Sequence, residues 1–302
     1  MAAKAGVSAG ALALVLASVL WGTTGTAASF LPDAVSPLAI GTSTMAVGGA
    51  LLFLVSARGA LAAIGHPEAR RWLLVGAIGV FVYPLAFYSA MDEAGVAIGN
   101  VVALGSGPVF AVILEWLWER RGLSSRWLLS TTIAVVGIVL LGFGGHGRAG
   151  SGNIVLGVLL GLLAGLAYAL YTYASSRAIA TGHAGRSVMG GMFGLGAILL
   201  VPVLLLTGAP LLASYTTVGV AGYLAVGPMF FAYLLFGFGL VNLRSSVVTT
   251  ITLIEPLVAT LLAVLIVGER LDTGGWVGLA LILVGVTVIV SARQQRNPPV
   301  EL

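Results

Sequence analysis

One acidic residue, Glu255, lies in the middle of a long apolar segment. The segment that begins at Ser245 carries no other charged residue until Glu269. If it spans a membrane, a carboxylate at its centre costs about 2.5–3.5 kcal/mol on insertion scales, so the group should face a partner, the protein interior or water. A carboxyl group in that position suits proton coupling. The alternative is structural, with the carboxyl group bonded to a neighbouring hydroxyl or to backbone groups that Pro256 frees.

Prolines occur inside several apolar segments. Proline removes one backbone hydrogen bond and kinks a helix. Interrupted helices are therefore predicted at Pro84, Pro108, Pro202, Pro228 and Pro256. Such breaks expose carbonyl groups to a cavity and permit bending. We predict a gating role for Pro108 and Pro256, which occupy matching positions in a repeat described below. Ordinary curvature of packed helices is the alternative for each proline.

Aromatic and small polar side chains occur within the same apolar segments. A tyrosine in mid-membrane needs a partner for its hydroxyl and therefore tends to face inward, where its ring can stack on a flat or apolar ligand. Packing between helices is the alternative for most of these rings, and an interhelical hydrogen bond is the alternative for Asn100. The predicted substrate-binding residues are Trp21, Thr24, Tyr83, Phe87, Asn100, Tyr168, Tyr171, Tyr233 and Thr252.

The composition indicates a membrane environment. Of 302 residues, 59% are hydrophobic and 8% are charged, whereas soluble proteins carry about 25% charged residues. A chain so poor in charge cannot cover a surface that faces water. At roughly 30 residues per helix and loop, it has room for about ten spans. The net charge of +4 does not indicate nucleic acid as a partner, because the basic residues lie in short loops rather than on one face.

Several kinds of site are excluded by the residues present. The chain has no cysteine, which rules out disulfides, thiolate metal sites and a cysteine nucleophile. The histidines His66, His146 and His183 fall in predicted loops without metal-ligand spacing. No GxxxxGK[ST] loop is present to bind a nucleotide phosphate. We expect no cofactor, no metal and no enzymatic activity, and as partners a small molecule and membrane lipid.

Ten apolar stretches bounded by charges, proline or glycine are the predicted spans, at 9–30, 37–56, 72–91, 95–116, 127–144, 154–175, 187–207, 216–238, 244–267 and 274–292. If both termini are cytoplasmic, only Arg148 and Arg270 of the 14 basic residues fall outside. This asymmetry favours that orientation. Spans three and four are separated only by a tight turn at Asp92–Gly95, because two adjacent acids do not lie cheaply in hydrocarbon.

The two halves of the chain resemble each other at an offset near 148 residues. The matching pairs are Pro108 with Pro256, Trp127 with Trp276, and Val136–Gly137 with Val284–Gly285. Because each half holds an odd number of spans, the second copy must be inverted relative to the first. Inverted repeats place a binding site near the midplane and let it face either side in turn. The predicted fold is an all-α integral membrane protein of two inverted five-helix repeats, residues 1–150 and 151–302, around a central cavity.

A family resemblance rests on three stretches. "PVFAVILEWLWERRG" and "EPLVATLLAVLIVGERLDTGGWVGLALILVGVTVIV" resemble the fourth helix and the ninth and tenth helices of EamA-type carriers, and "LASVLWGTTGTAASFL" resembles their first helix. These carriers belong to the drug/metabolite transporter superfamily. The resemblance implies a carrier in a bacterial inner membrane that exports metabolites such as amino acids. Gly107 stands where the second half has Glu255, so only one half supplies the acid.

The preferred interpretation is an exporter of neutral or aromatic amino acids that works by alternating access, in the aromatic amino acid exporter branch. A nucleotide-sugar, sugar-phosphate or drug carrier is the alternative, although Arg244 alone is placed to hold a phosphate. A channel and a membrane-embedded lipid enzyme are alternatives of another class. A channel more naturally repeats around an axis normal to the membrane, and the enzyme needs paired acids or histidines, to which only Asp92 and Glu93 come close.

The spans also carry packing signals. Spans one, three, four, six, eight and nine are predicted to form the cavity, and spans five and ten to brace the scaffold. Gly157, Gly161 and Gly165 recur every four residues and predict a smooth ridge for close helix contact. Trp127 and other tryptophans at span ends are predicted to anchor at the membrane interface.

Overall fold

The fold is an all-helical membrane bundle, as the sequence predicts. The computed structural model describes residues 2–32, 34–120, 124–144, 152–268 and 272–291. Within these residues, eight helical segments are long and apolar enough to cross a bilayer, and two shorter apolar helices, Ser125–Leu140 and Thr273–Ile289, complete the set. Helices suit hydrocarbon because they satisfy their own backbone polar groups.

The first five spans are α1 (Ala2–Ala28), α2 (Pro37–Gly65), α3 (Pro67–Ala94), α4 (Val96–Glu119) and α5 (Ser125–Gly144). The next two are α6 (Ile154–Ala180) and α7 (Gly185–Thr207), followed by the short η1 (Ala209–Leu212). Three pieces form the eighth span: α8 (Tyr215–Leu224), η2 (Ala225–Phe231) and α9 (Ala232–Asn242). The last two spans comprise α10 (Ser245–Ile251), α11 (Ile254–Leu262), η3 (Ala263–Val267) and α12 (Thr273–Ser291).

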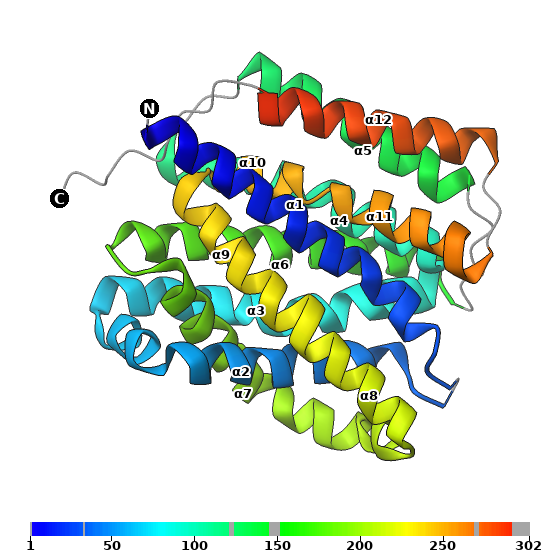
Figure 1. Ribbon diagram of the computed structural model, residues 1–302, viewed down its shortest axis with the longest axis horizontal. Helices are drawn as coiled ribbons and strands as arrows, with labels where there is room; N and C mark the ends of the chain where they lie inside the picture. The colour runs from blue at the N-terminus through cyan, green and yellow to red at the C-terminus, as the bar shows by residue number, and fades with distance from the viewer. Residues whose placement is uncertain (1, 33, 121–123, 145–151, 269–271, 292–302) are drawn as a thin grey trace.

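The spans run along the long axis of the bundle, and α1 begins at the end where α12 finishes (Figure 1). We call this the terminal end and the opposite one the far end. The first half starts at the terminal end and crosses five times, so α6 starts at the far end and the second half is inverted. The expected boundary between residues 150 and 151 lies outside the described residues.

The turn between α3 and α4 is shorter than predicted. Helix α3 continues through Asp92 and Glu93 to Ala94, and Gly95 alone reverses the chain with φ of 91°. Glycine adopts such a φ without steric cost. The Glu93 carboxylate accepts a hydrogen bond from the backbone N–H of Asn153 at 2.7 Å. The turn thereby ties the first half to the start of the second at the far end.

Helices α5 and α12 pack against each other along one side of the bundle (top in Figure 1). A Cβ atom on Gly137 would lie 2.6 Å from the carbonyl oxygen of Gly278 and 2.8 Å from the backbone nitrogen of Ile282. A Cβ atom on Gly285 would lie 2.6 Å from the carbonyl oxygen of Ser130. Gly137 and Gly285 match in the sequence repeat, so each half supplies the same close approach. The bracing role predicted for these spans requires such a contact.

The glycine ridge predicted on the sixth span is confirmed. A Cβ atom on Gly157, Gly161 or Gly165 would meet side chains from the end of α3 or from α4. Helix α6 therefore approaches these two helices closely enough for backbone contact. This crossing carries the second half of the chain across the first and brings the α6 tyrosines toward the middle of the bundle.

The prolines affect their helices unequally. At Pro228 the eighth span becomes the π-helical η2, and shortly before Pro256 the ninth span breaks at Thr252–Leu253. Three other helices run unbroken through their prolines, Pro84, Pro108 and Pro202. The predicted interruptions at these three positions are therefore wrong. A packed helix can absorb one lost hydrogen bond by curving, and Pro108 and Pro256 match in sequence without matching in local structure.

The contact between α5 and α12 yields a stability prediction. Changing Gly137→Ala should force the two backbones apart and destabilise the protein by about 1–3 kcal/mol, as overpacking typically does. Thermal unfolding in detergent measures the loss. Gly222→Ala is the matched control, because a Cβ atom there meets nothing within 4 Å. If the two variants unfold at the same temperature, the close approach is not needed for stability.

Candidate functional site

A cavity of about 670 Å³, its mouth included, lies between the two halves. Its walls come from α1 to α4 in the first half and from α6, η2, α9 and α11 in the second. Eight of the residues singled out from the sequence line it: Trp21, Thr24, Tyr83, Phe87, Tyr168, Tyr171, Tyr233 and Glu255. The structure thus brings most of the predicted constellation together, and contact of these residues with a substrate stays a prediction.

The cavity occupies the far half of the bundle and reaches its middle. Trp21 and Thr24 lie in the last third of α1, which ends at the far end. Thr44 lies two turns into α2, which begins there, and Leu104 lies in the far half of α4. Access to the cavity is therefore from the far end.

Two hydrogen bonds at mid-bundle form the floor of the cavity. The hydroxyls of Tyr171 and Tyr233 are 2.8 Å apart, and the hydroxyls of Tyr168 and Thr252 are 2.6 Å apart. The ring of Phe193 packs on Tyr233 with 4.3 Å between ring centroids. Thr252 is not itself a lining residue and acts on the cavity through Tyr168. Because these hydroxyls bond each other, the floor is rigid.

Four polar groups on the cavity wall remain free to meet a ligand. The hydroxyls of Thr24, Tyr83 and Tyr88 and the carboxyl group of Glu255 all belong to lining residues. None of these groups makes a hydrogen bond or ion pair within the described part of the chain. The structural role considered for Glu255, as a partner for a neighbouring hydroxyl, is therefore absent from the described residues. Tyr88 is an addition to the predicted set.

Besides Thr252, three of the predicted residues do not line the cavity. Asn100 lies in the second turn of α4, Pro108 lies inside α4, and Pro256 follows Glu255 in α11. Their predicted roles stay predictions. Pro84 and Pro228 do line the cavity, and the irregular segment η2 therefore borders the site at Pro228.

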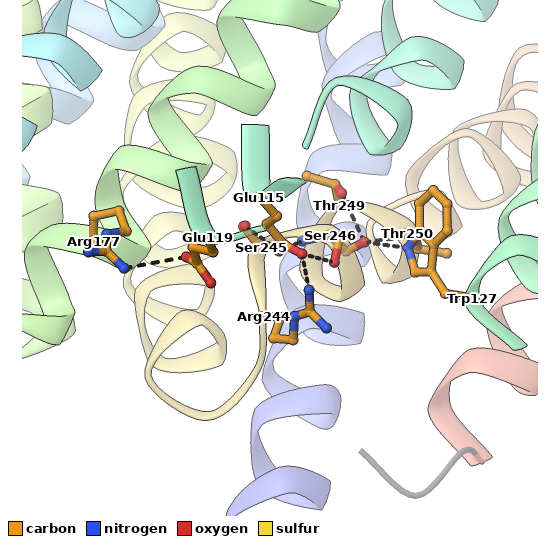
Figure 2. A network of polar contacts seen from close by, with 9 residues as sticks. All are labelled: Glu115, Glu119, Trp127, Arg177, Arg244, Ser245, Ser246, Thr249 and Thr250. Carbon is orange, nitrogen blue, oxygen red and sulfur yellow. Dashed lines mark hydrogen bonds and ion pairs between the residues drawn. The ribbon is translucent and has the colours of Figure 1, made fainter. Parts of the chain in front are cut away.

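A buried polar cluster lies toward the terminal end of the bundle, near the end of α4 and the start of α10 (Figure 2). We call it the lock and define it as Glu115, Arg244, Ser245 and Ser246. The Glu115 side chain is 4% exposed, and its Oε2 lies 2.6 Å from Nη2 of Arg244. The same carboxylate accepts hydrogen bonds from the Ser245 hydroxyl at 2.7 Å, from the Ser246 backbone N–H at 2.8 Å and from the Ser246 hydroxyl at 2.9 Å. The lock joins α4 of the first half to α10 of the second.

Trp127 supports the lock from the side and corrects a prediction. Its ring is buried, and its Nε1–H donates to the carbonyl oxygen of Ser246 at 3.3 Å. Thr131 and Thr250 continue the contact between α5 and α10, with 3.1 Å between their hydroxyl oxygens. The interfacial anchoring role predicted for Trp127 is therefore wrong. Its position near the start of α5 points it at α10, which local sequence does not reveal.

A second ion pair lies beside the lock. Nη1 of Arg177 is 3.4 Å from Oε1 of Glu119, which links α6 to α4 (Figure 2). The guanidinium also lies over the ring of Trp72, 5.8 Å from its centroid. Cation–π contacts of this kind add modestly to such a pair. Arg177 and Arg244 are thus both engaged, and Arg244 is the residue considered for phosphate binding.

Sequence reasoning missed Glu115. The residue lies four positions before the end of α4, beside Trp116 and close to Glu119, so it resembles an acid at the membrane surface. One signal was available: the second half carries Ala263 at the matching position. An acid present in only one copy of a repeat is a candidate for a specific role, as is also true of Glu255.

Comparisons with known proteins identify relatives across the whole chain. The model of the "EamA-like transporter family" matches residues 8–143 and again 155–291. The chain is 33% identical over 292 residues to the "Uncharacterized transporter YwfM" of Bacillus subtilis (strain 168), covering 95% of each. It is 26% identical over 283 residues to an "Uncharacterized transporter" of Archaeoglobus fulgidus, covering 92% of this chain and 95% of that one.

A solved structure shares the fold. It is described only as "Crystal structure of protein", and it superposes with a TM-score of 0.77 at 22% sequence identity, covering 93% of this chain and 96% of that one. The double match to one family model agrees with the repeat inferred from the sequence.

The position of the lock leads to a prediction about which end of the protein admits a reagent from water. The chain has no cysteine, so one introduced cysteine is a unique reporter for a membrane-impermeant thiol reagent. Thr24→Cys in the cavity should react in the otherwise unchanged protein, and Thr249→Cys, fully buried between floor and lock, should not. Adding Glu115→Gln should raise the rate at Thr249→Cys at least about tenfold, because losing one partner of a buried ion pair costs about 3–5 kcal/mol.

Glu68→Gln is the control for the lock experiment, because it makes the same exchange at an exposed position of α3. It should leave both rates unchanged. An unreactive Thr249→Cys in a folded Glu115→Gln protein would show that the lock does not hold the terminal end closed.

Proposed function

Because the chain belongs to the EamA-like transporter family, we propose that it is a secondary carrier that moves small metabolites across the membrane by alternating access. The observation that carries the proposal is the cavity, which both halves line. In the proposal, the lock closes the terminal end of the bundle. A site between inverted repeats can face either side as the halves rock against each other. The family is one of transporters and not of enzymes.

The two repeats correspond to the two parts that move in the proposed carrier. In the proposal, residues 1–150 and 151–302 act as the two moving halves. The lock crosses between them, since Glu115 belongs to the first half and Arg244 to the second. Breaking it frees the terminal end, and the cavity then closes at the far end. The proline breaks at Pro228 and Pro256 lie in the second half, where bending is easiest.

We place the protein in a bacterial inner membrane with both termini in the cytoplasm. The support is the positive-inside rule, because the basic loops gather at the terminal end. The cavity then opens outward, and the lock closes the cytoplasmic side. The described conformation is the one that releases an exported substrate.

For the substrate we propose neutral or aromatic amino acids, moved outward, in line with the aromatic amino acid exporter branch. The aromatic lining and the free hydroxyls of Thr24, Tyr83 and Tyr88 support a flat, partly polar ligand. A sugar phosphate or nucleotide sugar is less well served. The arginine considered for that role, Arg244, is held by Glu115 at the lock.

Proton coupling through Glu255 yields a transport prediction. In proteoliposomes with an imposed proton gradient, Glu255→Gln should abolish accumulation of a transported amino acid, because an amide cannot take up and release a proton. Glu68→Gln should accumulate substrate like the unchanged protein. Thermal unfolding of both variants shows whether they fold. Full accumulation by folded Glu255→Gln would remove Glu255 from the coupling step.

The same liposomes separate a carrier from the two rival classes. Saturable flux that responds to a counter-gradient of substrate is the property of a carrier. Flux that rises linearly with concentration would indicate a channel, and chemical conversion of lipid would indicate an enzyme.

A further inference from the structure

We infer that the cavity prefers aromatic amines with a single positive charge to amino acids, which carry a carboxylate as well. The inference rests on the proposed carrier function and names a different ligand class, amines, for the same cavity. It derives from the charges and rings on the cavity wall.

The cavity wall carries one acidic side chain and no basic one among its described lining residues. Glu255 is the only ionisable acid or base among the lining residues, apart from tyrosines. Its carboxyl group makes no ion pair within the described residues, and Tyr83 and Tyr88 line the same cavity. A protonated amine is the ligand group that supplies the missing opposite charge.

Aromatic rings surround the same space. Tyr83 and Phe87 stack with 5.4 Å between centroids and 17° between planes, and Phe87 meets Tyr88 edge to face at 5.3 Å. Trp21 lines the cavity from α1. Ring faces attract an ammonium group within about 6 Å of their centroids, and they also stack on an aromatic ligand. Both parts of an arylalkylamine therefore find suitable partners.

A substrate carboxylate has no comparable partner. No basic residue is among the described residues that line the cavity, and two partly buried arginines outside it, Arg177 and Arg244, are engaged by Glu119 and Glu115. The hydroxyls of Thr24, Tyr83 and Tyr88 can donate hydrogen bonds to a carboxylate but leave its charge uncompensated. Next to an ionised Glu255, a second negative charge is repelled.

Four ligands that share one phenyl ring test the inference. Phenethylamine and phenylalaninol are monocations, phenylalanine is a zwitterion, and 3-phenylpropionate is an anion. Titration calorimetry on the purified full chain should show both amines binding at least about tenfold more tightly than phenylalanine, with 3-phenylpropionate weakest. Phenylalaninol is the sharpest probe, because it differs from phenylalanine only in carrying a hydroxymethyl group in place of the carboxylate.

Variants of Glu255 show whether its charge is the cause. Glu255→Gln should lower the affinity for both amines about tenfold and remove their advantage over phenylalanine, whereas Glu255→Asp keeps the charge and should keep the preference. Glu68→Gln should match the unchanged protein. Phe87→Leu provides a second arm that leaves every charge in place, and it should weaken all ring-bearing ligands severalfold.

Three results would overturn the inference: phenylalanine binding as tightly as phenylalaninol, no binding of either amine, or a preference that survives in folded Glu255→Gln. None of them touches the carrier proposal, which depends on saturable counter-gradient flux and on the exchange of accessibility between Thr24→Cys and Thr249→Cys. Conversely, amine binding without any flux would keep the ligand class and reject the carrier.

Discussion

The Glu115 carboxylate constrains the rest of the structure more than any other group. An ionised acid buried between helices costs several kcal/mol unless its charge and its lone pairs are met. Here Arg244, Ser245 and Ser246 meet them together, and all three belong to one short stretch before and within α10. The carboxylate therefore fixes where the ninth span begins relative to the fourth. With the terminal end drawn together in this way, the helices leave their free space in the far half.

The two repeats share a fold but not their acids. In the sequence repeat, Gly107 of the first half matches Glu255, and Ala263 of the second half matches Glu115. Backbone packing, as at Gly137 and Gly285, follows the symmetry, because it depends on shape alone. The acidic residues do not follow the symmetry of the repeats, because Glu115 in the lock and Glu255 in the cavity each occur in one half only. In a carrier with perfectly symmetrical halves, the conformation open at one end and the conformation open at the other have equal free energies. Acids that occur in only one half make these two free energies unequal.

The sequence predicts most of the fold because the bilayer constrains each short stretch of the chain separately. Runs of apolar residues mark the spans, glycines every four residues mark the α6 ridge, and aromatic residues within spans mark the cavity wall. What escaped prediction depends on partners far along the chain. Glu115 and Trp127 look like interfacial residues until α10 is placed beside them. Pro108 and Pro256 look equivalent, yet only the second lies by a broken helix, since neighbouring helices decide whether a proline bends or breaks its own.

Helix α10 connects the two polar centres mechanically. It begins at Ser245 in the lock and ends at Ile251, next to Thr252, which bonds Tyr168 in the cavity floor. At 1.5 Å per residue, the six steps from Ser246 to Thr252 span about 9 Å. Beyond the break at Thr252–Leu253, α11 carries Glu255. A short rigid rod between floor and lock cannot shift at one end alone. Any rearrangement at Glu255 that displaces Thr252 therefore also displaces Ser245 and Ser246, which bond Glu115. We infer that the open cavity and the closed terminal end belong to one conformation.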